Sequence, residues 1–175
     1  MVIQMKLVVA VDKNWAIGYK GELLARVRAD LRNFSAITTG HTVVLGSKTL
    51  STFPGGRVLK NRTNIVMTRN ENFRPEGAII ASSVEKLLDI VKDMDTDEVY
   101  VIGGASIYTQ LLPYCDTAIV TKFNKSYEYD AAIENLDLSP DWECVEMGEW
   151  QVSNPETDSE ADLEFCFTTY KRKAL

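Results

Sequence analysis

Short apolar runs separated by polar segments dominate the chain as far as Thr121. These runs are rich in β-branched residues and are bounded by Gly, Asn or Asp, a pattern typical of strands that are buried on both faces. They lie at Lys6–Val11, Thr42–Leu45, Asn64–Thr68, Ala78–Ala81, Glu98–Ile102 and Thr117–Thr121. The pattern therefore predicts that each run forms a strand of a buried sheet.

Helical patterns lie between several of the predicted strands. Apolar residues recur at helical spacing over residues 27–34, and Ser83 can cap a helix over Val84–Val91. A further short helix is expected over Ser106–Leu112, where Pro113 stops it. Because strands alternate with helices, we predict an α/β fold with a mostly parallel central sheet.

The C-terminal part of the chain has a different pattern. Trp142–Trp150 and Leu163–Arg172 each alternate between apolar and polar residues, which indicates strands with one buried face. The polar and acidic stretch Gln151–Ala161 separates them as a long turn. We therefore expect an antiparallel hairpin at one edge of the sheet.

Length and composition are those of an ordinary globular domain. The 175 residues are 45% hydrophobic and 25% charged, so we expect a single domain over residues 1–175 with its own core. The net charge of −6 disfavours nucleic acid as a partner, because a polyanion would be repelled. No apolar run is long enough to span a membrane, and Met1–Ala10 is too short for a secretory signal, which predicts a cytoplasmic protein.

The cysteines and the single histidine argue against several kinds of site. Cys115, Cys144 and Cys166 are odd in number and widely spaced, so they predict neither a disulfide framework nor, with His41 alone, a zinc site. We expect three reduced, buried thiols. A nucleophilic mechanism would have to use His41, and the sequence therefore favours chemistry that rests on a carboxylate or on a bound cofactor.

A carboxylate on an apolar stripe is the first candidate for chemistry. Asp30 lies with Val27, Leu31 and Phe34 at positions i, i+3, i+4 and i+7 of the predicted helix. One interpretation is a cap or first-turn charge that complements the helix dipole. The other is a partly buried carboxylate at a pocket wall, which could bind a polar heterocycle or serve a proton transfer.

Three strand exits are further candidates for ligand contacts. Ile102–Ser106 runs from a buried strand through two glycines into a helix, which is either a tight turn or a site where backbone approaches a pyrophosphate. Leu45–Thr49 and Met67–Arg69 each place a hydroxyl and a cation at a strand end. Each cation alone is an ordinary surface charge, whereas the two together could bracket a phosphate. A dinucleotide with an extra phosphate is therefore a plausible ligand.

Blocks of sequence over nearly the whole chain resemble the dihydrofolate reductase family. The blocks are AVDKNWAIGYKGEL, ADLRNF, VVLGSKTLSTFP, LKNRTNIVMTR, VYVIGGASIYTQLLP and VTKF, followed by the closing hairpin. The resemblance implies a three-layer α/β sandwich around an eight-stranded, mostly parallel sheet with an antiparallel C-terminal hairpin. It also implies reduction of 7,8-dihydrofolate to tetrahydrofolate, with hydride transfer from NADPH to C6 and protonation at N5.

The resemblance assigns a set of substrate contacts. Asp30 matches the family's pocket carboxylate, which holds the pterin and promotes protonation at N5, and Thr121 matches its hydroxyl partner. The apolar walls around the pterin and benzoyl rings match Val8, Val9, Leu31, Phe34, Phe53, Leu59 and Ile102. Arg62 matches the residue that pairs with the glutamate carboxylate, a bidentate interaction for which arginine is suited.

The resemblance assigns cofactor contacts in the same way. The matches to nicotinamide contacts are Ala10, Ile17, Gly18 and Thr49, with Tyr108 as an aromatic residue near that ring. The pyrophosphate turn, where the family has a cis Gly-Gly peptide, matches Gly103, Gly104, Ser106 and Ile107. The 2′-phosphate site matches Lys48, Thr68 and Arg69, and Gly46 and Ser47 belong to the same predicted strand exit. The resemblance thus favours NADPH over NADH.

One loop departs from the family. Where the family reads Leu-Pro-Trp over the nicotinamide, this chain has Leu23-Leu24-Ala25, and Trp15 is not at the equivalent position. The change removes a large aromatic surface and a donor N–H. From the sequence we expect Ala25→Trp, alone or with Leu24→Pro, to fill the vacated room and raise turnover. The competing expectation is that the loop has adapted to the change, for instance by turning Trp15 inward, so that a second indole overpacks the site and lowers activity.

Two other functions remain open at the level of sequence. The first is a reductase of the same fold that acts on another heterocycle, such as the riboflavin-pathway pyrimidine reductase. Arg62 argues against it, because that substrate lacks a glutamyl tail. The second is a non-catalytic protein that binds NADPH or folate. For each of these functions we expect a monomer with a small-molecule ligand and no membrane or nucleic-acid partner.

Overall fold

A computed structural model of the protein describes residues 4–173. The described chain forms two compact units, one of residues 4–7 and 38–116 and the other of residues 8–37 and 117–173. Strands β1 (Met5–Val11) and β8 (Cys115–Phe123) each contribute to both units. The hydrogen-bonded strand order is β10-β12-β8-β1-β7-β4-β5-β6, and β11 pairs with β12 beside this row.

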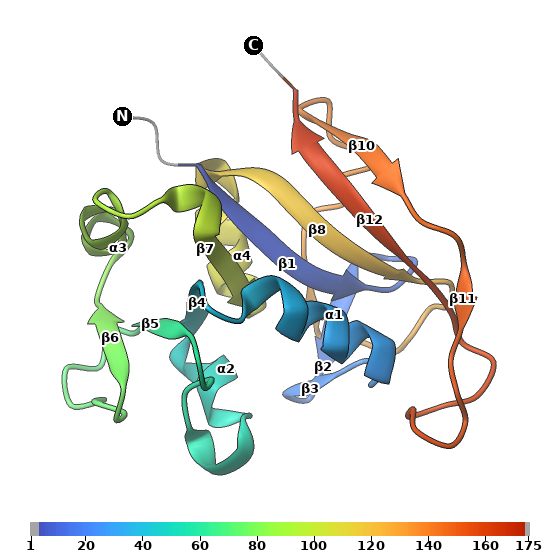
Figure 1. Ribbon diagram of the computed structural model, residues 1–175, viewed down its shortest axis with the longest axis horizontal. Helices are drawn as coiled ribbons and strands as arrows, with labels where there is room; N and C mark the ends of the chain where they lie inside the picture. Colours follow the sequence, from blue (N-terminus) through green and yellow to red (C-terminus); the bar gives the residue numbers. More distant parts are fainter. Residues whose placement is uncertain (1–3, 174–175) are drawn as a thin grey trace. The chain divides into compact units, whose positions relative to one another are not determined.

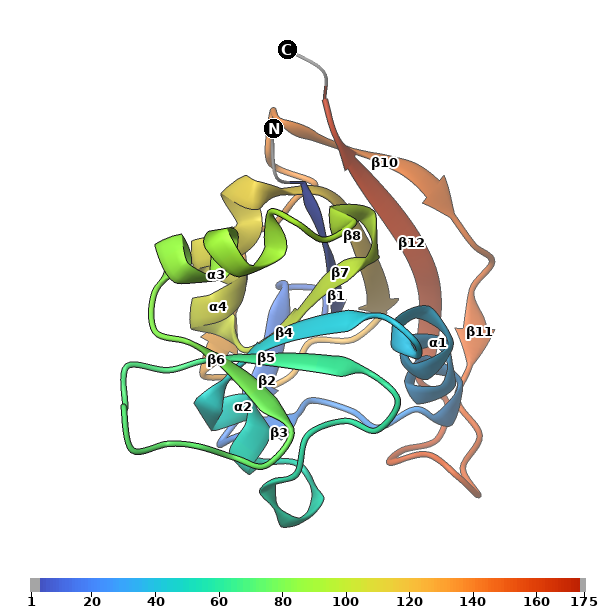
Figure 2. The ribbon, with the colours of Figure 1, turned by 60° about the vertical axis from the view of Figure 1, so that its left-hand side comes forward.

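Parallel strands form the sheet of the first unit. Its strands are the beginning of β1, β4 (Thr42–Gly46), β5 (Thr63–Met67), β6 (Ala78–Ala81) and β7 (Val99–Gly103). Figure 2 shows β7, β4 and β5 next to one another. The pairs β1–β7, β7–β4, β4–β5 and β5–β6 are all parallel, as the β-branched runs predict. All of these strands lie within a residue or two of the predicted ranges.

Short helices follow the strands of this unit. They are α2 (Ser47–Ser51), α3 (Val84–Val91) and α4 (Ala105–Leu111), with 3₁₀ turns at Pro54–Gly56, Thr96–Glu98 and Leu112–Tyr114. Ser83 caps α3 as predicted, because its Oγ accepts a 3.1 Å hydrogen bond from the backbone N–H of Lys86. Leu87 and Val91 then bury the apolar face of α3. Helix α2 was not predicted, because its five residues are too few to show a helical period.

Antiparallel strands characterise the second unit (Figure 1). β12 (Glu164–Arg172) lies between β8 and β10 (Trp142–Met147) and is antiparallel to both, while β11 (Gln151–Val152) pairs with its other end. Helix α1 (Arg28–Thr38) carries the sequence ADLRNF. The predicted hairpin is confirmed, although β10 ends at Met147 rather than Trp150 and the predicted long turn contains β11.

A small second sheet was not predicted. It consists of β2 (Ala16–Tyr19), β3 (Glu22–Leu23) and β9 (Ala131–Ala132), in the order β3-β2-β9. Strands of two residues carry no alternating pattern, so only their partners define them. This sheet fixes the backbone of Ile17 and Gly18, two residues that the resemblance assigns to the cofactor.

The structure confirms the α/β fold class and corrects one expectation about the cysteines. All three thiols are free, and Cys115 and Cys166 are buried as expected, whereas Cys144 is exposed. Cys144 lies on β10, which stands at the end of the strand order and whose residues from Glu143 to Met147 are all exposed. Among residues 4–173, no helix is long and apolar enough to cross a membrane.

Candidate active site

The carboxylate of Asp30 and the hydroxyl of Thr121 are joined by a hydrogen bond. Asp30 lies in the first turn of α1, and Thr121 is a buried residue of β8. The Thr121 hydroxyl donates to Asp30 Oδ1 over 2.7 Å. Asp30 is therefore a first-turn charge and also a half-buried carboxylate with a specific partner.

Burial changes the protonation of Asp30. It raises the pKa of this carboxyl above the ordinary aspartate value, and the hydrogen bond from Thr121 opposes the rise in pKa without cancelling it. A carboxyl with a raised pKa holds its proton closer to neutral pH, as general acid–base chemistry requires. The neighbouring apolar side chains stay accessible: Leu31 is 41% exposed and Phe34 is half-buried.

Strands β1 and β2 carry the other predicted contacts of the second unit. Val8 and Val9 are buried in β1, and Ala10 is half-buried beside them. Ile17 and Gly18 are half-buried in β2, where Gly18 pairs with both Leu23 and Ala131. The structure thus fixes the backbone of these residues through strand pairing.

The first unit brings together three of the predicted apolar wall residues. Phe53, Leu59 and Ile102 are partly buried and pack against one hydrophobic cluster. The buried members of that cluster are Val43, Leu45, Leu50 and Val66. The three side chains therefore share a rigid support while part of each surface stays accessible.

Arg62 is held in place by two hydrogen bonds within the first unit. Its Nε donates to Thr38 Oγ1 over 2.9 Å, and its terminal nitrogen donates to the carbonyl of Lys60 over 2.9 Å. Burial lowers the pKa of Arg62, but the guanidinium remains protonated at neutral pH because an arginine side chain is a far weaker acid than any other cationic group of a protein. A guanidinium fixed in this way is preorganised to bind a carboxylate.

Asn64 supports this part of the chain, and its role was not predicted from the sequence. Its side chain is 1% exposed, accepts a hydrogen bond from Leu59 N and donates to the carbonyls of Leu59 and Arg62. The amide therefore fixes the turn that presents Leu59 and Arg62. A polar residue at the start of the apolar run NIVMT is the one sequence signal that could have indicated it.

Glycines occupy the two strand exits at β4 and β7. The peptide bond between Gly103 and Gly104 is cis, and α4 begins directly after it with no side-chain cap. A Cβ on Gly104 would lie 3.1 Å from Thr49 Oγ1, and a Cβ on Gly46 would lie 3.0 Å from a side-chain carbon of Ile107. Both positions therefore favour glycine and leave bare backbone at the starts of α2 and α4, which suits a pyrophosphate.

The two basic strand exits lie in neighbouring positions. Gly46 of β4 and Met67 of β5 are partners in the parallel register, so Lys48 and Arg69 follow adjacent strand ends. Both side chains are exposed. Thr68 directly precedes Arg69, and its hydroxyl oxygen accepts a hydrogen bond from Asn70 N. The remaining predicted contacts of this unit are half-buried Ser47 and Thr49, exposed Ser106, and buried Ile107 and Tyr108.

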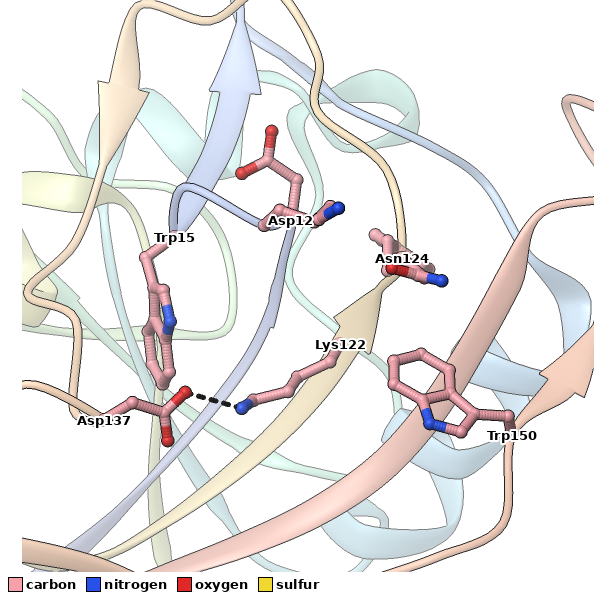
Figure 3. A pocket seen from close by; sticks show the side chains of 8 residues that line it. Asp12, Trp15, Lys122, Asn124, Asp137 and Trp150 are labelled. Carbon is pink, nitrogen blue, oxygen red and sulfur yellow. Dashed lines mark hydrogen bonds and ion pairs between the residues drawn. The ribbon is translucent and has the colours of Figure 1, made fainter.

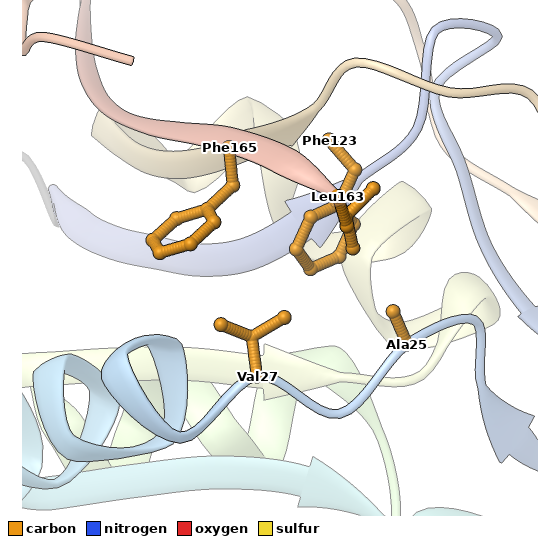
Figure 4. Close-up of a cluster of buried hydrophobic side chains, with 5 residues drawn as sticks. All are labelled: Ala25, Val27, Phe123, Leu163 and Phe165. Atoms are coloured by element: carbon orange, nitrogen blue, oxygen red, sulfur yellow. The ribbon is translucent and has the colours of Figure 1, made fainter. Parts of the chain in front are cut away.

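Ala25 is buried in a hydrophobic cluster, contrary to the expectation of a vacated space. Its exposed fraction is 5%, and its methyl group points toward Phe123 and Leu163 (Figure 4). Val27 and Phe165 complete the buried part of the cluster. The segment is also fixed by its backbone, because Arg26 N donates to Ser159 Oγ over 2.9 Å. The expectation that Ala25→Trp fills an empty space is therefore wrong.

Ala25→Trp is now expected to destabilise the fold rather than improve turnover. Overpacking a filled core costs about 1–3 kcal/mol, which for a chain of this size lowers Tm by about 2–12 °C. Thermal unfolding of the variant tests this expectation, with Leu23→Trp as a control because Leu23 is already 49% exposed. A variant with parent Tm and higher kcat would contradict the buried position of Ala25.

Comparisons with known proteins agree on one family. The family model for dihydrofolate reductase matches residues 4–172. Dihydrofolate reductase of Bacillus subtilis (strain 168) is 34% identical over 171 residues, which cover 97% of this chain and 95% of that protein. The Haemophilus influenzae enzyme is 33% identical over 165 residues, 94% and 98% of the two chains. The structure of Enterococcus faecalis dihydrofolate reductase with NADP(H) and RAB-propyl matches with a TM-score of 0.83 and 29% identity, over 99% of both chains.

Proposed function

The chain belongs to the dihydrofolate reductase family and is an NADPH-dependent oxidoreductase, and from this premise we propose that it reduces 7,8-dihydrofolate to 5,6,7,8-tetrahydrofolate. In the proposed reaction a hydride is transferred to C6 and N5 is protonated. The observation that carries the proposal is the Asp30 carboxyl, which has a raised pKa and a hydroxyl partner at 2.7 Å.

Asp30 has the properties that protonation at N5 requires. Burial makes its ionised form costly, so the carboxylate is stabilised by a ligand that donates hydrogen bonds to it, as the amino group and ring nitrogens of a pterin do. Thr121 fixes the orientation of Oδ1 and leaves Oδ2 as an acceptor toward the ligand. In this way Asp30 would bind the pterin and promote its protonation.

Residues of the first unit would hold the cofactor. When bound, NADPH supplies the hydride. The pyrophosphate would lie against the backbone at Gly46, Gly103 and Gly104. Because glycine has no side chain, the backbone at these positions can approach a phosphate closely. Lys48 and Arg69 would bind the 2′-phosphate through charge-assisted hydrogen bonds.

Arg62 favours a folate over the heterocycle of the alternative reductase. A guanidinium held by Thr38 and Lys60 is preorganised for a carboxylate, and the glutamate tail of dihydrofolate provides one. The direct test is the oxidation of NADPH followed at 340 nm with and without dihydrofolate. Oxidation that depends on dihydrofolate supports the proposal. Binding of both ligands without oxidation would favour the non-catalytic alternative, and oxidation only with the pyrimidine substrate would favour the other reductase.

Arg62→Ala is expected to raise KM for dihydrofolate by about 10- to 150-fold with a much smaller change in kcat. The loss of a charged hydrogen-bonding partner costs about 1.5–3 kcal/mol, and the glutamate tail is remote from the transferred hydride. Steady-state kinetics measure both constants. Arg74→Ala is the matched control, because Arg74 is an exposed arginine of the same unit. Equal KM in parent and Arg62 variant would point to a substrate without that carboxylate.

The oligomeric state of the protein and its location in the cell remain predictions from the sequence. We propose that the protein acts as a monomer on small molecules in the cytoplasm. Gel filtration with light scattering would test the monomer, and a dimer at micromolar concentration would contradict it.

A further inference from the structure

Asp12 is a buried carboxylate outside the residues proposed to contact substrate or cofactor. It follows the last residue of β1 and is 2% exposed. Its charge is balanced by backbone donors: Asn14 N at 2.8 Å and Ala16 N at 3.0 Å donate to Oδ1, and Tyr127 N at 2.9 Å donates to Oδ2. A buried charge is costly without such partners, so three backbone donors indicate a specific structural task.

The first oxygen of Asp12 shapes the loop between β1 and β2. Trp15 N donates to the backbone carbonyl of Asp12, and Asp12 N donates to that of Ala16, each over 3.1 Å. This closure places Trp15 at φ 58°, a left-handed conformation that is rare for a bulky residue. The indole of Trp15, drawn in Figure 3, is buried. It meets the ring of Tyr170 edge-on, with the ring centroids 5.6 Å apart. The carboxylate and the buried indole together hold the loop in this conformation.

The second oxygen of Asp12 reaches the segment that follows β8. Tyr127, whose N–H donates to this oxygen, belongs to that segment. Backbone hydrogen bonds also join the segment to the loop and to β2. Lys125 O accepts from Lys13 N over 3.0 Å, and Asp130 N donates to Gly18 O over 3.1 Å. Strand β9 then pairs with β2 at Ala16 and Gly18. One carboxylate therefore joins the start of β2 to the segment that pairs along it.

We propose that Asp12 is a positioning residue for hydride transfer. One of its oxygens fixes the loop before β2, and the other fixes the segment that pairs with β2. The inference rests on the proposed function, with Ile17 and Gly18 of β2 as the nicotinamide contacts that the resemblance to the family implies. A change at Asp12 would shift those contacts without removing any group that touches a ligand. Small misplacements of this kind lower hydride transfer more than they lower binding.

Asp12→Asn separates the two tasks of the carboxylate. The amide oxygen of asparagine can replace Oδ1 and keep the bonds from Asn14 N and Ala16 N. Its NH₂ group would then occupy the place of Oδ2 and face the N–H of Tyr127, so two donors would oppose each other. The variant therefore keeps the loop and breaks the bond to the segment after β8.

The experiment measures hydride transfer and local opening in the same protein. Single-turnover rates with NADPH and with its deuterated form should fall by about 10- to 100-fold in Asp12→Asn, while the Kd for NADPH stays that of the parent. The kinetic isotope effect should become more dependent on temperature. Backbone amide exchange should become faster in residues 12–19 and 124–132 alone. Asp95→Asn is the control, because the side chain of this exposed aspartate accepts a hydrogen bond from Asp97 N at 3.1 Å, which asparagine can also accept.

Each outcome decides one question. If Asp12→Asn has the single-turnover rate of the parent, and its backbone amides in both segments exchange as they do in the parent, the inference is overturned. A lower rate with faster exchange throughout the chain would also overturn it, because Asp12 would then act on global stability. If the parent shows no oxidation that depends on dihydrofolate, the proposed function fails. In that case, faster exchange confined to the two segments would still support the coupling through Asp12.

Discussion

Asp30→Asn is expected to lower turnover of dihydrofolate by about 10²–10⁴-fold near neutral pH while leaving NADPH affinity unchanged. General acid–base assistance is typically worth this factor, and an amide cannot stabilise a protonated pterin as a carboxylate does. The amide can still accept the hydrogen bond from the Thr121 hydroxyl, so the local structure should persist. Single-turnover rates and NADPH titrations measure the two effects, and Asp93→Asn, which changes an exposed carboxylate, serves as control.

The pH dependence of turnover and stability follows from the raised pKa of Asp30. Parent turnover should fall as pH rises through that pKa, whereas the remaining activity of Asp30→Asn should increase toward acidic pH, where the substrate protonates unaided. A raised folded-state pKa contributes stability below the unfolded value of about 3.9, and this contribution is lost as pH rises through the folded value. Asp30→Asn should therefore gain stability relative to the parent in denaturant titrations as pH rises from the unfolded value through the raised folded-state pKa of Asp30. Parent turnover in the variant at neutral pH would refute the assigned role.

Replacing both Lys48 and Arg69 by alanine is expected to weaken NADPH binding by about 10- to 100-fold and to leave NADH binding nearly unchanged. Only the 2′-phosphate distinguishes the two cofactors. Each of the two charge-assisted bonds to an exposed cation is worth about 0.7–1.4 kcal/mol after screening by solvent, and together they give this factor. The adjacent strand ends at Gly46 and Met67 bring both cations to one edge of the sheet. The double variant should turn over at the parent kcat once NADPH is saturating.

Titration of both cofactors into this double variant tests the phosphate site. A double variant of Lys86 and Arg74 to alanine removes the same charge from exposed positions of the same unit and serves as control. Raising the salt concentration should reduce the NADPH preference of the parent more than that of the Lys48 and Arg69 variant, because screening weakens phosphate contacts. An unchanged NADPH preference would place the phosphate site elsewhere.

The sequence by itself determined the elements whose signals are local. The runs that became β1, β4, β5, β6, β7 and β8 contain enough β-branched residues to be recognised, because burial on both faces selects such residues along one short stretch. The cap at Ser83 and the turn at Gly103-Gly104 are local in the same sense. The order of motifs also determined the family, and through it the expected site residues.

Only the tertiary structure decided the contacts between distant residues. The partners Asp30 and Thr121 are 91 positions apart, and Asp12 and Tyr127 are 115 positions apart, so no periodicity along the chain relates them. Ala25 was misjudged for the same reason, because Phe123 and Leu163, which are far from it in the sequence, pack beside it. A side chain's residue type and neighbours in sequence set which bonds it can form. The packing of distant segments sets which of those bonds exist and how much burial shifts a pKa.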